Sequence, residues 1–189
     1  MGAVHGNYRR RHNPWANFSN VPASSNLPFT DFPSPDRFDS LPTVSIVVPD
    51  LVNDMHYGST STGDAWLRDH LDAYIRWAET HNSLFILTWD ESHVAGPNHI
   101  PTLFVGPMVR PGAYPESVNH LHLLRTLEDL YGLPYAGETE NVAPIVDVWQ
   151  EPAPEAAGPS SAPKKNTGGC GALGIVAGLI VASLRLRRR

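Results

Sequence analysis

The sequence has one cysteine, no basic stripe through its central region and no apolar core near its first residues. A single cysteine, Cys170, cannot form an intrachain disulfide, so a disulfide framework is excluded. The formal net charge is −5, and the absence of clustered Lys and Arg in the central region argues against nucleic acid as a partner, because binding to a phosphate backbone needs such clusters. The segment Met1–Asn7 lacks the apolar stretch of a signal peptide. Either the protein is not secreted in this form, or its N-terminus lies further upstream.

The composition is that of a folded globular domain. Hydrophobic residues make up 41% and charged residues 17% of the 189 positions, which is ordinary for a soluble fold and argues against disorder of the whole chain. This length allows one domain with appendages. Nine histidines are a mild excess, compatible with metal or phosphate chemistry.

Apolar patterning predicts alternating strands and helices in the central region. The expected strands are Thr43–Val48, Leu84–Trp89 and Thr102–Val105, and the expected helices are Ser61–Ala78 and Ser117–Tyr131, with Gly132 as the stop of the second helix. This order predicts an α/β fold with a mostly parallel sheet and helices on its faces. In such folds, ligands gather at the carboxyl ends of the strands.

The C-terminal region differs from the rest of the chain in composition. Residues 150–167 are rich in Pro, Ala and Ser, and are expected to form a disordered linker. Residues 168–189 combine an apolar stretch with terminal arginines, which favours a membrane-spanning hydrophobic helix with its arginines on the cytoplasmic side. The Gly-Cys pair, apolar stretch and arginines resemble C-terminal sorting signals of some Gram-negative surface proteins, which predicts a cell-surface or membrane-anchored location. The alternative is a buried terminal helix.

Asp54 and His56 directly follow the first predicted strand. On an extended backbone, alternate side chains point to the same side, so both are expected to face one site. A carboxylate and an imidazole together can bind a divalent metal or hold an anionic substrate. The alternative is a solvated loop with an incidental histidine.

Asp90 and Glu91 end the apolar strand Leu84–Trp89. Two adjacent carboxylates at the mouth of a buried strand need a compensating cation, which a metal ion or arginines could supply. The alternative is a helix cap or a pair of exposed turn acids. His120 stands near the start of the last predicted helix, where unpaired backbone N–H groups favour anions, so it is a further candidate. The alternative is that His120 only occupies the first turn of that helix.

At these residues the chain resembles a known family, the bacterial and fungal acid phosphatases and phospholipases C of the alkaline-phosphatase-like superfamily. The similar segments follow one another in family order from Tyr8 to about Trp149: Tyr8–Trp15, Ser25–Phe32, Leu41–His56, Ser61–Leu67, His81–Glu91, Ile100–Tyr114 and Asn119–Pro134. The resemblance implies a three-layer sandwich, of which residues 1–149 would form the C-terminal half.

The resemblance also implies a reaction, the metal-assisted hydrolysis of a phosphate ester. In the family, a metal-bound Ser or Thr attacks phosphorus, and water then releases the phosphate. Asp90 and Glu91 match the acidic pair that binds the divalent metal ion. His56 matches a histidine that contacts the phosphoryl group or protonates the leaving oxygen, and Asp54 precedes it in the same motif. His12 and His120 also fall in family motifs.

The chain departs from the family pattern in three ways. Asp50 occupies a place where the family often has Asn, and the loop after Glu91 is short. The family's N-terminal half supplies a Glu–Asn pair for the metal and the hydroxyl nucleophile, and neither has a counterpart in this sequence. Three hypotheses follow: a phosphate-ester hydrolase lacking its nucleophile half, a surface-anchored remnant or binding module without catalysis, and a sulfuric-ester hydrolase or phosphotransferase on the same scaffold.

Overall fold

The computed structural model describes residues 4–92 and 96–150, together with the backbone of residues 179–185. The chain divides into two compact units, the first formed by Met1–Pro107 with Ile175–Arg189 and the second by Met108–Gly174. Short elements precede the main sheet of the first unit: strands β1 (Val4–His5) and β2 (Tyr8–Arg9), and 3-10 helices η1 (Arg10–His12), η2 (Trp15–Asn17), η3 (Ala23–Ser25), η4 (Phe29–Asp31) and η5 (Pro35–Ser40).

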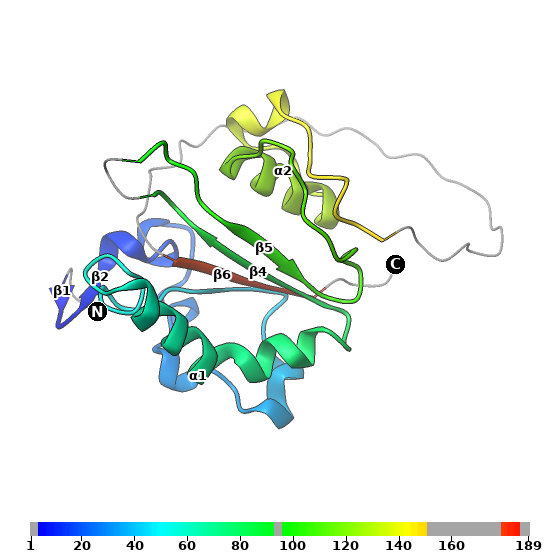
Figure 1. The fold of residues 1–189 in the computed structure, drawn as a ribbon. Helices are drawn as coiled ribbons and strands as arrows, with labels where there is room; N and C mark the ends of the chain where they lie inside the picture. Colours follow the sequence, from blue (N-terminus) through cyan, green and yellow to red (C-terminus); the bar gives the residue numbers. More distant parts are fainter. Residues whose placement is uncertain (1–3, 93–95, 151–178, 186–189) are drawn as a thin grey trace. The chain divides into compact units, whose positions relative to one another are not determined.

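The main sheet of the first unit has four strands in the order β3-β6-β4-β5 (Figure 1). Their bounds are Val44–Val47 for β3, Ser83–Trp89 for β4, Thr102–Val105 for β5 and Leu179–Arg185 for β6. The strands β3, β4 and β5 therefore form within two residues of the positions that patterning predicts. The same holds for the helix between β3 and β4, which is α1 (Thr60–Ala78). Each neighbouring pair of strands is antiparallel.

The expectation of a mostly parallel sheet is therefore wrong. β6 runs antiparallel to both β3 and β4, so these two strands point in the same direction with one strand between them. The strand–helix–strand order predicted their common direction correctly. The sheet is antiparallel because of two other strands. β6 lies between β3 and β4, and β5 runs antiparallel to β4 along its other edge.

The expected C-terminal hydrophobic helix is also not found among the described residues. Residues 179–185 (LIVASLR) form β6, and no helix within the described part of the chain is long and apolar enough to cross a bilayer. Ile180 and Val181 are β-branched and favour strands, and β3 and β4 offer backbone partners on both sides. The remaining positions of the predicted helix and the linker from residue 151 lie outside the described residues.

Helix α1 (Thr60–Ala78) covers one face of the sheet. Its N-cap is Ser59, two residues before the predicted start, whose hydroxyl accepts a hydrogen bond from the Thr62 N–H (3.2 Å). Leu71, Tyr74 and Ala78 point into the core at helical spacing and are almost fully buried.

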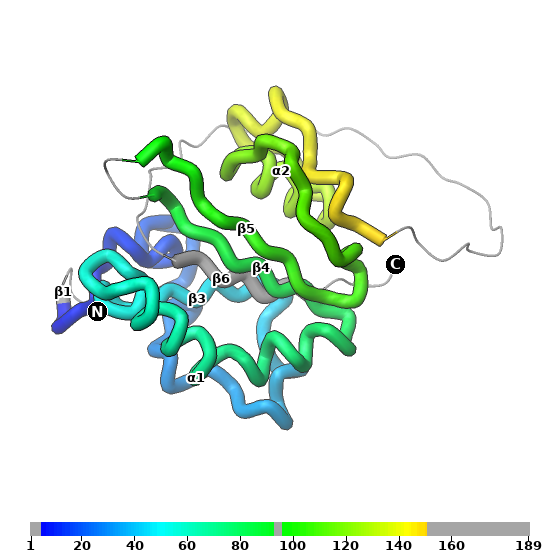
Figure 2. Tube along the Cα trace, in the orientation of Figure 1, coloured from blue at the N-terminus to red at the C-terminus, as the bar shows by residue number. Residues whose placement is uncertain are grey.

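These helical side chains pack with Phe85 and Leu87 of β4 and with Phe38 of η5. The rings of Phe38 and Tyr74 meet edge to face, with centroids 5.2 Å apart. Figure 2 shows the segment that contains η5 beside α1, which agrees with their contacts. The segment before β3 therefore completes the core on the helix side of the sheet.

The second unit contains α2 (His120–Tyr131) and η6 (Gly137–Asn141). Asn119 caps α2 by accepting from the Leu121 N–H (3.0 Å), and Gly132 ends it in the left-handed conformation (φ 62°), as predicted. The ring of His122 interacts with Asn119 in a capping box, so His122 has a structural use at the helix start.

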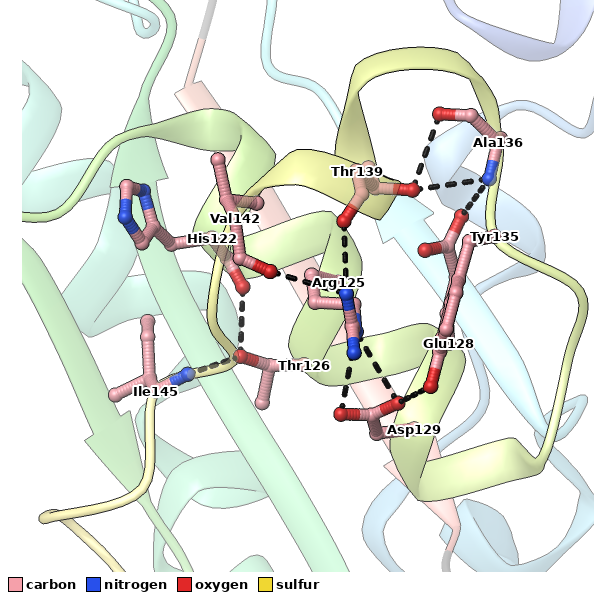
Figure 3. Close-up of polar contacts among 10 residues, drawn as sticks. All are labelled: His122, Arg125, Thr126, Glu128, Asp129, Tyr135, Ala136, Thr139, Val142 and Ile145. Atoms are coloured by element: carbon pink, nitrogen blue, oxygen red, sulfur yellow. Dashed lines mark hydrogen bonds and ion pairs between the residues drawn. The ribbon is translucent and has the colours of Figure 1, made fainter.

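A polar network ties α2 to the segment that follows it (Figure 3). Arg125 donates to the carbonyl oxygens of Thr139 (2.9 Å) and Val142 (3.0 Å), and its guanidinium lies 3.7 Å from the ring centroid of Tyr135. Glu128, only 3% exposed, accepts from the Ala136 N–H (2.9 Å). These bonds satisfy backbone groups of a segment with little regular structure of its own.

The network predicts an altered titration of Tyr135. Its hydroxyl donates to Asp129 (2.8 Å), and this hydrogen bond raises the pKa of Tyr135 above its ordinary value of 10.0. We expect the Asp129→Asn variant to bring the pKa of Tyr135 back toward 10.0, since the carboxylate that favours the neutral phenol is lost. NMR titration of labelled tyrosines, assigned with Tyr135→Phe, measures this, with Asp72→Asn as the control. An unchanged Tyr135 pKa in Asp129→Asn would show that the bond does not form in solution.

Candidate functional site

A tight turn after β3 carries the first predicted site residues. The carboxylate of Asp50 accepts from the backbone N–H groups of Val52 and Asn53 (both 3.1 Å) and from the Asn53 amide (2.8 Å). The Asp54 N–H donates to the Asp50 carbonyl (2.8 Å). Asp50 thus organises the turn through its side chain and its backbone.

The expectation that Asp54 and His56 point to the same side of an extended backbone is wrong. Met55 between them has a φ of 73°, in the left-handed region. Asp54 is consequently buried (4% exposed), whereas His56 is exposed. The two residues are still linked by a hydrogen bond, which the His56 N–H donates to Asp54 Oδ1 (2.8 Å).

His12 pairs with Asp54 across a long stretch of sequence. Nδ1 of His12 lies 3.1 Å from Oδ2 of Asp54, and the two side chains are 4% and 1% exposed. Nε of Arg11 donates to Nε2 of His12 (3.3 Å). A guanidinium has only donors, so Nε2 must accept, and the ring proton on Nδ1 is donated to Asp54. The carboxylate therefore fixes both the tautomer and the orientation of His12.

His56 stands next to this pair at the surface. Its ring centroid lies 5.3 Å from that of His12, at an interplanar angle of 77°, and 4.7 Å from the ring of Tyr57. No residue in the described part of the chain hydrogen-bonds the His56 ring. One carboxylate, that of Asp54, thus holds a buried histidine by its ring and an exposed histidine by its backbone, which leaves the second ring accessible to a substrate.

Arg11 belongs to this site although its sequence position alone does not single it out among three consecutive arginines. Arg9 donates to the carbonyls of Gly6 and Tyr8, and Arg10 donates to the carbonyl of Ala16, so both support the local backbone. Arg11 is exposed and contacts His12. The adjacency of Arg11 to the site histidine is the signal that could have identified it.

The predicted metal ligands lie at the end of β4. Asp90 is half-buried and Glu91 is exposed. Among the described residues, no three His, Cys, Asp or Glu side chains are grouped so that they could hold a metal ion. The described residues alone therefore do not fit a complete metal site, and the ligand roles of Asp90 and Glu91 stay predictions. His120 is the first residue of α2 in the second unit, and its site role also stays a prediction.

Two hollows adjoin the paired residues in the first unit. A small cavity of about 30 Å³ is bordered by His12 and Asp54. A larger groove of about 590 Å³ has apolar walls that include Leu27, Phe29 and Ile46. Asn13 and Val48 border both hollows, so the groove begins beside the His12–Asp54 pair.

The comparison with protein families decides the family of this chain. Residues 2–134 match the Phosphoesterase family, and this range includes β3, α1, β4, β5 and every residue of the His12–Asp54–His56 cluster. The chain belongs to the phosphoesterase family. The resemblance to phosphate-ester hydrolases is thus confirmed.

Two curated relatives are similar to this phosphoesterase. A phosphatidylinositol-3-phosphatase from Mycobacterium tuberculosis is 53% identical over 144 residues, which are 76% of this chain and 48% of the relative. A phosphate-repressible acid phosphatase from Penicillium chrysogenum is 28% identical over 146 residues, which are 69% of this chain and 34% of the relative. The chain therefore spans about half or less of the length of these relatives. No solved structure matches the phosphoesterase chain.

Gly63 of this phosphoesterase is expected to be sensitive to substitution. A Cβ atom there would lie 2.7 Å from Cγ of Met55 and 3.2 Å from the carbonyl oxygen of Asn53. Alanine in a helix is ordinarily about 1 kcal/mol more favourable than glycine. We expect Gly63→Ala instead to destabilise the protein by about 1–2 kcal/mol, because it crowds the turn that presents His56. Urea denaturation measures this change against Asp64→Ala at the neighbouring exposed position. A stabilised Gly63→Ala protein would show that the turn does not rest on α1.

Proposed function

We propose that this chain contributes to the hydrolysis of phosphomonoesters, with Asp54 holding His12 and His56 in place and with Arg11 and His56 facing the phosphoryl group. The observation that carries this proposal is the double use of the Asp54 carboxylate, which accepts from the His12 ring and the His56 backbone. This arrangement lies within the phosphoesterase match.

The chemistry follows from what each exposed group can do. Hydrolysis of a phosphate ester requires stabilisation of charge on the phosphoryl oxygens and a proton for the departing alcohol. The guanidinium of Arg11 uses Nε on His12, so its terminal N–H groups can bind phosphoryl oxygens. The imidazole of His56 can supply the proton, because its backbone is fixed while its ring is accessible.

The names of the relatives support a phosphomonoester as the substrate class. One is called a phosphatidylinositol-3-phosphatase and the other an acid phosphatase. The groove beside the His12–Asp54 pair has apolar walls that could receive the alcohol portion of such an ester. Of the two reactions that the family resemblance implies, cleavage of a phosphomonoester is therefore favoured over cleavage of the phospholipase C type.

A divalent metal ion is part of the proposal. It would supply positive charge at the phosphoryl oxygens, and Asp90 and Glu91 would be its ligands in this chain. Two carboxylates are fewer ligands than such ions take in proteins, so further ligands must come from beyond the described residues. The resemblance assigns a Glu–Asn pair and the nucleophile to the family's N-terminal half, which would make this chain a fragment of the whole catalytic domain.

The test is turnover of p-nitrophenyl phosphate with divalent metals. The chain is assayed alone and fused to the unmatched half of the mycobacterial relative. We expect turnover by the fusion and its loss in Asp90→Ala. A folded fusion without turnover, or with turnover unaffected by Asp90→Ala, contradicts the proposal.

The second candidate function is a binding module without catalysis. It is favoured by the lack of a three-ligand metal cluster among the described residues. In that case the fusion would bind inorganic phosphate in calorimetry without hydrolysing the ester, and Arg11→Ala would weaken this binding. A cell-surface location remains a proposal, tested by surface labelling of intact cells that express the chain.

A further inference from the structure

The centre of the main sheet is occupied by a strand from a distant part of the sequence. β6 pairs with four residues of β3, from Val44↔Leu184 to Val47↔Val181, and with all seven residues of β4, from Ser83↔Arg185 to Trp89↔Leu179. β3 and β4 are joined through α1 and point in the same direction, but they do not pair with each other. The unit β3–α1–β4 thus leaves a gap one strand wide, and β6 fills it.

The strands on either side of this gap lie within the part of the chain that matches the family, and the strand inside the gap does not. β3, β4 and β5 all lie within residues 2–134, which match the Phosphoesterase family, whereas β6 begins at Leu179. The residues that match the family therefore include the two strands that border the gap and do not include β6. The mycobacterial relative shares 144 residues with this chain, and these are 48% of its length. More than half of that relative lies outside the match, and this unmatched part could supply the strand that fills the corresponding gap.

Without a strand between β3 and β4, the folded state would lose stability. Leu84, Phe85 and Ile86 of β4 are at most 2% exposed, so the backbone beside them is remote from water. Without a neighbour, its N–H and C=O groups on that edge would be buried and unpaired, at a cost of about 1–3 kcal/mol for each group. A strand in this position is thus a requirement of the sheet, while its sequence and its source can vary, because pairing is made by backbone atoms.

We propose that the gap between β3 and β4 is a strand-acceptor site, which β6 fills in this chain and which can instead accept an extended apolar strand from the half of the family domain that this chain does not match. β6 is then a replaceable occupant. Tethering gives it an effective concentration in the millimolar range, so a competing strand binds only when β6 is weakened or displaced. This inference concerns assembly and does not depend on the catalytic proposal.

The first experiment tests the position of β6 by cross-linking the full chain. Ile86 and Ala182 are Cα partners across the β4–β6 ladder. In a Cys170→Ser background, the pair Ile86→Cys with Ala182→Cys is expected to form a disulfide under mild oxidation. The matched control moves the second cysteine to Ser183, which is the Cα partner of Phe85 and not of Ile86. Equal cross-linking of the two pairs, or of neither, overturns the proposal.

The second experiment tests whether the site accepts a strand from outside. The Val181→Pro variant removes a backbone donor from β6 in the middle of the sheet, and Ala162→Pro is the control at a position that does not belong to β6. A fluorescent peptide with the β6 sequence LIVASLR is titrated and followed by anisotropy. We expect Val181→Pro to bind it at least tenfold more tightly than the wild-type chain, the Ala162→Pro control or the cross-linked protein. Equal binding by Val181→Pro and the cross-linked protein overturns the proposal.

The third experiment tests the source of the competing strand. Overlapping seven-residue peptides from the unmatched half of the mycobacterial relative are used to displace LIVASLR from the Val181→Pro chain. We expect at least one peptide to compete, and a scrambled version of it not to compete. If no peptide from that half displaces LIVASLR, the proposed origin of the strand is wrong.

Discussion

Replacing His56 with alanine is expected to lower kcat/KM for an alkyl phosphate such as glycerol phosphate, whose leaving alcohol needs a proton, by roughly 10²–10⁴-fold in the fusion with the unmatched half of the relative, which is the range for loss of a general acid or base. The folded state should be nearly unaffected, because the His56 side chain is exposed and the bond to Asp54 is made by the backbone N–H, which alanine retains. A large loss of rate without a loss of stability would place the His56 imidazole in the reaction.

His5 provides a matched control for this substitution. It is an exposed histidine of β1, and alanine there should change kcat/KM less than twofold. Added imidazole should partly restore turnover in His56→Ala, because the missing group is a proton carrier and the site is open to water. A rate loss smaller than about fivefold would contradict an acid–base role for His56, since such roles contribute more than this.

The second large effect is expected for stability. We expect His12→Ala to lower the free energy of unfolding by about 2–3 kcal/mol, since it leaves Oδ2 of the buried Asp54 carboxylate without its hydrogen-bond donor. Urea denaturation at neutral pH measures this. The matched control is Arg11→Ala, which removes an exposed side chain from the same 3-10 helix and should cost less than about 1 kcal/mol.

The two substitutions also separate positioning from substrate binding. If Arg11 faces the phosphoryl group, Arg11→Ala should raise KM or weaken phosphate binding while the protein stays folded. If His12→Ala costs no more stability than Arg11→Ala, then Asp54 is solvated in the protein and the His12–Asp54 pair does not organise the turn.

Local patterning predicts the elements of this fold well. The alternation of apolar residues and the breakers around them identify β3, β4 and β5, and helical spacing identifies α1 and its buried face. Gly132 was recognisable as a helix stop because only glycine adopts its left-handed conformation at little cost. These features depend on neighbours in sequence, which is why the sequence reveals them.

The arrangement of the sheet depends on a distant segment and could not be predicted in this way. The apolar residues of β6 follow a region of linker composition and satisfy the pattern of a membrane helix as well as that of a central strand. Only the unpaired edges of β3 and β4 distinguish these possibilities, and those edges become visible only in three dimensions. Length alone does not separate a buried strand from part of a longer helix.

The candidate site was predictable in its residues and not in its geometry. Asp54, His56 and His12 could be selected from motifs, but the left-handed Met55 is invisible to an alternation rule, because nothing about a methionine signals a positive φ. The pairing of His12 with Asp54 likewise depends on how η1 meets the turn after β3. Arg11 was overlooked because its neighbours Arg9 and Arg10 share its chemistry.

The distant origin of β6 has a consequence for the order of folding. Val47 pairs with Val181, and most of the chain lies between these two residues in sequence. The middle of the sheet forms only after this pairing. Closing so large a loop has a high entropic cost, and contacts of this kind form slowly. We expect α1 and the α2 region to become protected from hydrogen exchange early during refolding. The amides of β3 and β4 should become protected last, when β6 pairs with these strands.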